Sequence, residues 1–102
     1  MNALKKRYSR HAEVDQHMVE ELDLYAENEA ALYPQKQAIL RNLQLKAKKG
    51  VYDAAKAAKL WGYWVEAASK RYRKEWPGVE ITKGTRDEVA KELARRYPKG
   101  VE

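Results

Sequence analysis

The chain has 102 residues, enough for one domain that buries a hydrophobic core, and it lacks cysteine, which excludes disulfides and thiolate metal sites. The basic N-terminal residues are not followed by an apolar run, and no window approaches the roughly 18 apolar residues of a membrane span. We therefore expect a soluble, cytoplasmic protein without a secretory signal and without a membrane partner.

The net charge of +6 is distributed unevenly along the chain. Residues 1–33 carry more acidic than basic side chains, and no lysine or arginine occurs between Ala12 and Tyr33. Residues 34–102 are strongly basic. Two explanations are open: the acidic segment covers part of the basic surface within the molecule, or a basic face remains available for an anionic partner such as nucleic acid.

Hydrophobic periodicity predicts a first helix from about Glu13 to Leu32. Its apolar stripe is interrupted only by Glu29. The stripe consists of Val14, Met18, Leu22, Tyr25, Glu29 and Leu32.

A second helix is predicted from Pro34, which suits a first helical turn, to Lys49, with Gly50 as a left-handed C-terminal cap. Its apolar face consists of Ile39, Leu40, Leu43 and Ala47.

The longest predicted helix runs from about Asp53, a good N-cap residue, to Trp76, where a Pro-Gly sequence ends it. At roughly 36 Å it spans a domain of this size and is expected to be its central element. Gly62 either permits close approach of another helix or marks a bend. Trp64 lies at the edge of the apolar stripe, and the sequence leaves open whether it is core or contact surface. The stripe, predicted to be core, consists of Ala54, Ala58, Trp61, Val65, Ala68, Tyr72 and Trp76.

The last helix is predicted from Thr85, as the N-cap of a capping box with Glu88, to about Tyr97. In the connection before it, Val79 and Ile81 can anchor the chain to the core. The predicted fold is therefore all-α: a compact four-helix domain over residues 12–102 with a long central third helix. Residues 1–11 are expected to be a basic, disordered N-terminal arm.

The third helix also carries basic side chains interleaved with aromatic ones, a combination that can hold phosphates and stack bases. The competing interpretation is that its lysines are only the solvated face of an amphipathic helix. Lys46, Lys48 and Lys49 of the preceding helix can extend this surface. The candidate nucleic-acid-binding residues are Lys56, Lys59, Tyr63, Lys70, Arg71, Arg73 and Lys74.

No pattern favours catalysis, a metal or a cofactor, so we expect a protein that is not an enzyme. The dispersed glycines form no phosphate-binding loop, and neither serine lies in a nucleophile elbow. Polar residues between His11 and Glu21 have metal-ligand chemistry, but the pattern is more typical of an exposed acidic helix face than of a metal site.

The turn Gly50-Val51-Tyr52-Asp53, followed by Lys59-Leu60-Trp61-Gly62-Tyr63, resembles a family of small helical proteins of tailed phages. Lys70-Arg71-Tyr72-Arg73-Lys74-Glu75 and the segment Thr85–Ala90 continue that likeness. The resemblance implies a phage or mobile-element accessory protein, in the host cytoplasm or the virion. It implies no activity, cofactor or catalytic residue.

The function we predict is non-enzymatic binding, with the basic helical surface engaging nucleic acid or a nucleic-acid-containing complex. The alternative is a protein–protein interaction module: a virion component, or an inhibitor of a host system such as an anti-CRISPR-type antagonist. Such a module would act through the acidic face of the first helix or through self-association. The sequence leaves the oligomeric state undefined.

Overall fold

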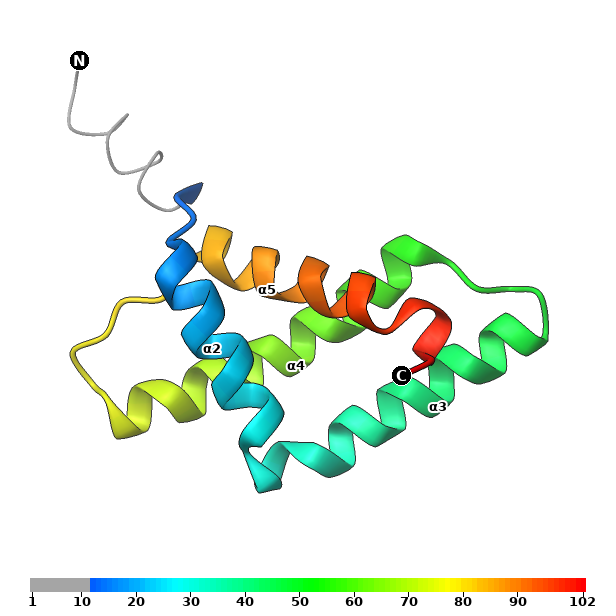
Figure 1. Ribbon diagram of the computed structural model, residues 1–102, viewed down its shortest axis with the longest axis horizontal. Helices are drawn as coiled ribbons and strands as arrows, with labels where there is room; N and C mark the ends of the chain where they lie inside the picture. Colours follow the sequence, from blue (N-terminus) through cyan, green and yellow to red (C-terminus); the bar gives the residue numbers. More distant parts are fainter. Residues whose placement is uncertain (1–11) are drawn as a thin grey trace, which may run out of the picture.

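The computed structural model of the protein describes residues 12–102 (Figure 1). Within them the chain forms four α-helices and no strand, which confirms the predicted all-α, four-helix class. The expected N-terminal arm, residues 1–11, lies outside the described residues. The elements are α2 (Gln16–Asn28), η1 (Ala30–Leu32), α3 (Tyr33–Lys48), α4 (Ala54–Glu75), α5 (Lys83–Arg96) and η2 (Pro98–Gly100), η denoting a short 3-10 helix.

Helix α4 is central, as predicted, and at 22 residues it is the longest described helix. The Asp53 side chain caps it by accepting hydrogen bonds from the backbone N–H groups of Ala55 (2.8 Å) and Lys56 (3.2 Å). Helices α2, α3 and α5 all contact α4, and in Figure 1 both α2 and α5 cross it obliquely. Because its neighbours leave one side uncovered, α4 is both the core helix and a surface helix.

The buried side chains form a hydrophobic cluster around Trp61 and Trp64 of α4. Leu22 of α2, Leu43 of α3 and Leu93 of α5 reach it from the surrounding helices. Trp64 is fully buried, and its indole Nε1 donates a 2.9 Å hydrogen bond to the Leu32 carbonyl of η1. Trp64 is therefore core and not contact surface.

The predicted single helix from Glu13 to Leu32 is wrong at both ends. Asp15 is the N-cap, so α2 begins at Gln16, and Val14 before it is 43% exposed. Glu29 takes an extended conformation and its side chain caps η1 by accepting from the Ala31 N–H. The one polar residue in the apolar stripe thus marks where the α-helix ends.

The predicted core stripe of α4 is right in the middle and wrong at its ends. Ala54 is exposed, Tyr72 is half-buried and Trp76 is 49% exposed. The ring of Trp76 packs on Tyr72, with centroids 4.6 Å apart, and Tyr72 meets Tyr25 of α2 at 5.2 Å. We call Tyr25, Tyr72 and Trp76 the aromatic corner. They lie at the C-terminal end of α4, which extends beyond most of the helices that cover it.

Helix α5 begins three residues earlier than predicted, because its N-cap is Thr82 rather than Thr85. The Thr82 hydroxyl accepts a 3.1 Å hydrogen bond from the Thr85 N–H. Thr85 itself is fully buried, and its hydroxyl accepts from the backbone N–H of Asp15 at 3.1 Å. The expected capping box is replaced by a contact that fixes the start of α5 against the start of α2. Ile81 is buried and Val79 packs against the core, as predicted.

The predicted ends of α3 are confirmed, since Pro34 lies in its first turn and Gly50 follows it at φ +75°. At the other end of the chain, Gly100 takes φ +77° and lies so close to α3 that an added Cβ would be 2.4 Å from the Leu40 carbonyl oxygen. Gln44 of α3 donates a 2.6 Å hydrogen bond to the Gly100 carbonyl. The C-terminal turn is thereby held on α3.

Candidate nucleic-acid interface

The outer face of α4 carries the predicted binding residues, and all seven of them are exposed. Five fall within one sector of about 60° around the helix axis, at 3.6 residues per turn. We call these five the α4 ridge: Lys56, Lys59, Tyr63, Lys70 and Lys74. Arg73 lies on one flank of the ridge and Arg71 on the other. The structure therefore brings five of the predicted residues into a line about 27 Å long.

Arg71 differs from the other predicted cations because its guanidinium lies 3.7 Å from the Glu29 carboxylate. Among residues 12–102, no carboxylate lies within ion-pair distance of the four ridge lysines or of Arg73. Arg71 therefore contributes to joining α4 with the segment before α3, while the ridge retains its positive charge.

Cations on α5 are mostly neutralised, in contrast to those of the ridge. Lys83 pairs with Asp87 at 2.8 Å on the same helix, and Arg86 reaches Glu66 of α4 at 3.1 Å. Arg95 pairs with Glu88 and Glu92, and Arg96 with Asp23 and Glu27. Lys91 of α5 and most cations of α3 also lack a carboxylate partner among residues 12–102, so what distinguishes α4 is that its unpaired cations lie in one line.

Acidic residues of α2 take part in these internal pairs. Asp23 and Glu27 bind Arg96, Glu27 also lies 2.9 Å from the Lys36 ammonium, and Glu29 meets Arg71. The acidic segment thus neutralises cations of α3, α4 and α5, as the intramolecular explanation of the charge asymmetry requires. It does not reach the ridge lysines, so the intramolecular explanation covers only part of the basic surface.

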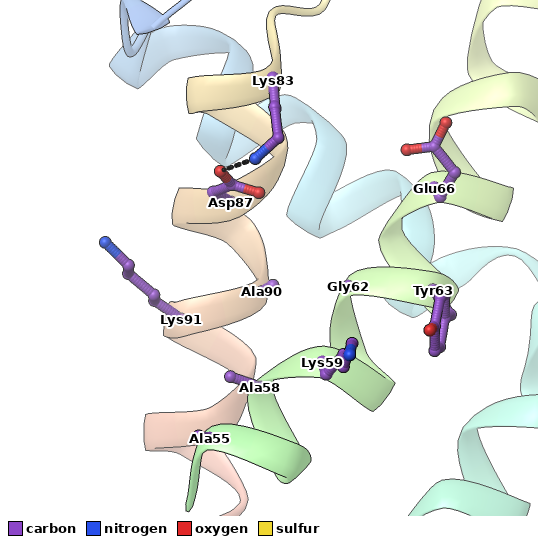
Figure 2. Close-up of a pocket in the computed structure, with 10 residues that line it drawn as sticks. All are labelled: Ala55, Ala58, Lys59, Gly62, Tyr63, Glu66, Lys83, Asp87, Ala90 and Lys91. Atoms are coloured by element: carbon purple, nitrogen blue, oxygen red, sulfur yellow. Dashed lines mark hydrogen bonds and ion pairs between the residues drawn. The ribbon is translucent and has the colours of Figure 1, made fainter.

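A groove runs between α4 and α5 along one flank of the ridge (Figure 2). Ala58 and Gly62 of α4 lie opposite Ala90 of α5 in this groove. The part of the groove between the two helices is therefore lined by small, uncharged residues. Lys59 lies on its α4 rim, Tyr63 lines it further along α4, and the Lys91 side chain points away from α4. The sequence did not predict this groove because its two walls are far apart in the chain.

Gly62 does not have the first role predicted for it, the close approach of another helix. A Cβ added there would meet no atom within 4 Å, so no neighbouring helix approaches closely at this position. Glycine within a helix costs about 0.5–1 kcal/mol relative to alanine. Nothing in the surrounding packing requires a glycine at this position. The missing side chain leaves an open groove beside Tyr63, which is 61% exposed.

Other chemistry is sparse in the part of the chain that the structure describes. No three histidine, aspartate or glutamate side chains of residues 12–102 are arranged to hold a metal ion, and Asp15 of the polar cluster serves as a helix cap. Ser69 is fully buried. None of the described helices is long and apolar enough to cross a membrane. Comparison of the chain with protein-family models, curated proteins and solved structures finds no match.

Proposed function

We propose that this protein is a non-enzymatic binding protein whose α4 ridge engages nucleic acid. The observation that carries the proposal is the line of four exposed lysines without carboxylate partners among residues 12–102, with one exposed tyrosine among them. On α5, by contrast, every cation except Lys91 is paired with a carboxylate of the described chain. A surface that keeps unmatched charge of one sign over about 27 Å suits a linear polyanion.

Each lysine that meets a phosphate releases condensed counterions, which favours binding at low salt without requiring a particular base sequence. Tyr63 adds an aromatic ring that can contact or stack on a base. The resemblance to small helical phage proteins supports an accessory role for such binding, in a host cell or a virion.

Fluorescence anisotropy with labelled oligonucleotides, titrated at several salt concentrations, tests the proposal. We expect the logarithm of the association constant to fall linearly with the logarithm of salt concentration, by about 0.9 per phosphate contact on duplex DNA and about 0.7 on single strands. Four ridge contacts on a duplex would give a slope of about −3.6. Absence of binding to both DNA and RNA at low ionic strength would exclude this function.

The aromatic corner supports a second candidate, a protein–protein interaction module. Trp76 is 49% exposed and stacked on Tyr72, and aromatic side chains of this kind are enriched in protein interfaces. Sedimentation at moderate salt tests its self-associating form. A dimer that persists in salt and is lost in a Trp76→Ala variant would favour this candidate, and a monomer under all conditions would count against it.

A further inference from the structure

Positive charge is not spread evenly along α4 but is concentrated near its two ends. Lys56 and Lys59 lie toward the N-terminal end, and Lys70, Arg73 and Lys74 toward the C-terminal end. Between them the outward residues are Tyr63 and Glu66, and Glu66 is neutralised by Arg86 at 3.1 Å. The ridge therefore has two cationic ends, separated by an uncharged middle.

The separation of the two ends suits the width of a DNA groove. From Lys59 to Lys70 the helix rises by about 16 Å, and the centres of the two cation groups are about 22 Å apart. The major groove of B-form DNA is about 12 Å wide and admits an α-helix of 10–12 Å diameter. A helix lying obliquely across that groove would bring one cationic end to each phosphate backbone, while its middle faces the bases.

The groove between α4 and α5 supplies the space that such docking needs. Insertion of a helix between two DNA backbones requires room beside the helix, and Ala58, Gly62 and Ala90 leave that room on the α5 side. The open space at Gly62, for which packing within the chain gives no reason, lies in the N-terminal half of α4, close to the cationic end formed by Lys56 and Lys59. Lys59 lies on the α4 rim, and the two acids that line the groove, Glu66 and Asp87, are paired with Arg86 and Lys83.

From these observations we infer that α4 binds double-stranded DNA by lying across its major groove, with one backbone received in the α4–α5 groove. This inference rests on the proposed nucleic-acid function and specifies its substrate class. A-form RNA duplexes have a deep, narrow major groove that does not admit a helix, so duplex DNA is selected over duplex RNA. A single strand lacks the two backbones at fixed separation that the two cationic ends would bind.

Competition among oligonucleotides of equal length and sequence tests the substrate class. With a labelled DNA duplex bound, unlabelled duplex DNA should displace it at a concentration about tenfold lower than duplex RNA or single-stranded DNA, because only B-form DNA meets both cationic ends. Equal competition by all three would overturn the inference while leaving the nucleic-acid function intact. Failure of every oligonucleotide to bind would remove both.

Gly62→Leu tests the position of the DNA backbone, because the Cβ of a side chain added there would meet no atom within 4 Å and a leucine would occupy part of the groove. The matched control is Ala38→Leu on the exposed side of α3. We expect Gly62→Leu to weaken duplex binding about tenfold without lowering the thermal stability, since leucine favours a helix more than glycine does, and we expect the control to bind and unfold close to wild type. Unchanged duplex affinity would overturn the inference. A second result would also overturn the inference: sedimentation shows that the wild type is a dimer and that Gly62→Leu is a monomer. The groove would then bind a second copy of the chain.

Discussion

Arg96 near the end of α5 donates two hydrogen bonds to Asp23 of α2, at 2.6 and 2.9 Å, in the side-by-side geometry of a guanidinium–carboxylate pair. The same guanidinium reaches Glu27 at 3.2 Å, and Glu27 also accepts a hydrogen bond from the Tyr97 hydroxyl. Lys36 of α3 completes the network by donating to the Tyr97 oxygen at 3.0 Å. Three helices are thus joined through charges, which explains why the acidic residues of α2 matter for the fold.

Removal of the Arg96 side chain should destabilise the protein. We expect Arg96→Ala to lower the free energy of unfolding by about 1–2 kcal/mol, since the pair is two-pronged but partly exposed to solvent. Arg95→Ala is the control, because Arg95 pairs only with residues of its own helix and should change stability little. Urea denaturation of the two variants checks this, and equal loss in both would contradict the structural role of the network.

Acid should weaken the same network through Glu27. Burial alone would raise the pKa of Glu27, but hydrogen bonds from Tyr97 and Lys36, with the charges of Lys36 and Arg96, hold it below its ordinary value. A carboxyl group whose pKa is lower in the folded state stabilises the fold above the ordinary glutamate pKa. This contribution is lost as the pH falls through the folded-state value.

Unfolding free energies measured from pH 7 to pH 3 test this effect. The wild type should lose stability below about pH 4.5, the ordinary glutamate value. Glu27→Gln should be less stable at pH 7 and should show a shallower loss toward acid. The exposed Glu20→Gln is the control. Parallel profiles of unfolding free energy against pH for wild type and Glu27→Gln would show that Glu27 is not the source of the loss of stability in acid.

Two glycines should respond in opposite directions to the same substitution. Gly62→Ala should raise the unfolding free energy by about 0.5–1 kcal/mol, because alanine favours the helix and its methyl group meets nothing. Gly100→Ala should lower it by about 1–3 kcal/mol, because the positive φ is strained for alanine and the Cβ would lie 2.4 Å from the Leu40 oxygen. Thermal or chemical unfolding of the two variants measures these changes. A change in unfolding free energy of the same sign in both variants would be inconsistent with these packing environments.

Iodide quenching of tryptophan fluorescence tests the unequal burial of the aromatic residues. Trp76 is 49% exposed, whereas Trp61 and Trp64 are inaccessible. Trp76→Phe should therefore remove most of the quenchable emission at little cost in stability. Trp64→Phe should leave the quenchable fraction in place and destabilise the protein by about 1–3 kcal/mol, since the Leu32 carbonyl loses its buried partner. Strong quenching that persists in Trp76→Phe would contradict this arrangement.

Local signals in the sequence predicted the elements well because local physics determines them. Asp53 caps α4 through its own side chain, and Gly50 adopts the left-handed conformation that ends a helix. Thr85 and Thr82 show the limit of such signals. Both are suitable caps, and the choice depends on Asp15, whose backbone N–H is bonded to Thr85 from far along the chain.

The candidate site was predicted in its residues but not in its shape. Exposure of the ridge lysines follows from the amphipathic pattern of α4, whereas the charge that remains unmatched depends on which acids the fold brings near. Glu29 neutralises Arg71, and no acid of residues 12–102 reaches Lys70. Hydrophobic periodicity likewise placed Trp76 in the same buried stripe as Trp61. Where the buried part of α4 ends depends on how α2 and α5 pack on it, and periodicity does not contain that information.

The most direct test of the α4 ridge compares two double variants that remove the same charge. Lys59→Gln with Lys70→Gln alters the ridge, and Arg41→Gln with Lys99→Gln alters exposed cations elsewhere. Binding to a DNA duplex is measured by anisotropy across a series of salt concentrations. We predict that the salt slope of the ridge variant is shallower than that of the wild type by about 1.8, the value for two lost phosphate contacts, and that the slope of the control variant is unchanged. Equal slopes and affinities for the two variants would contradict it.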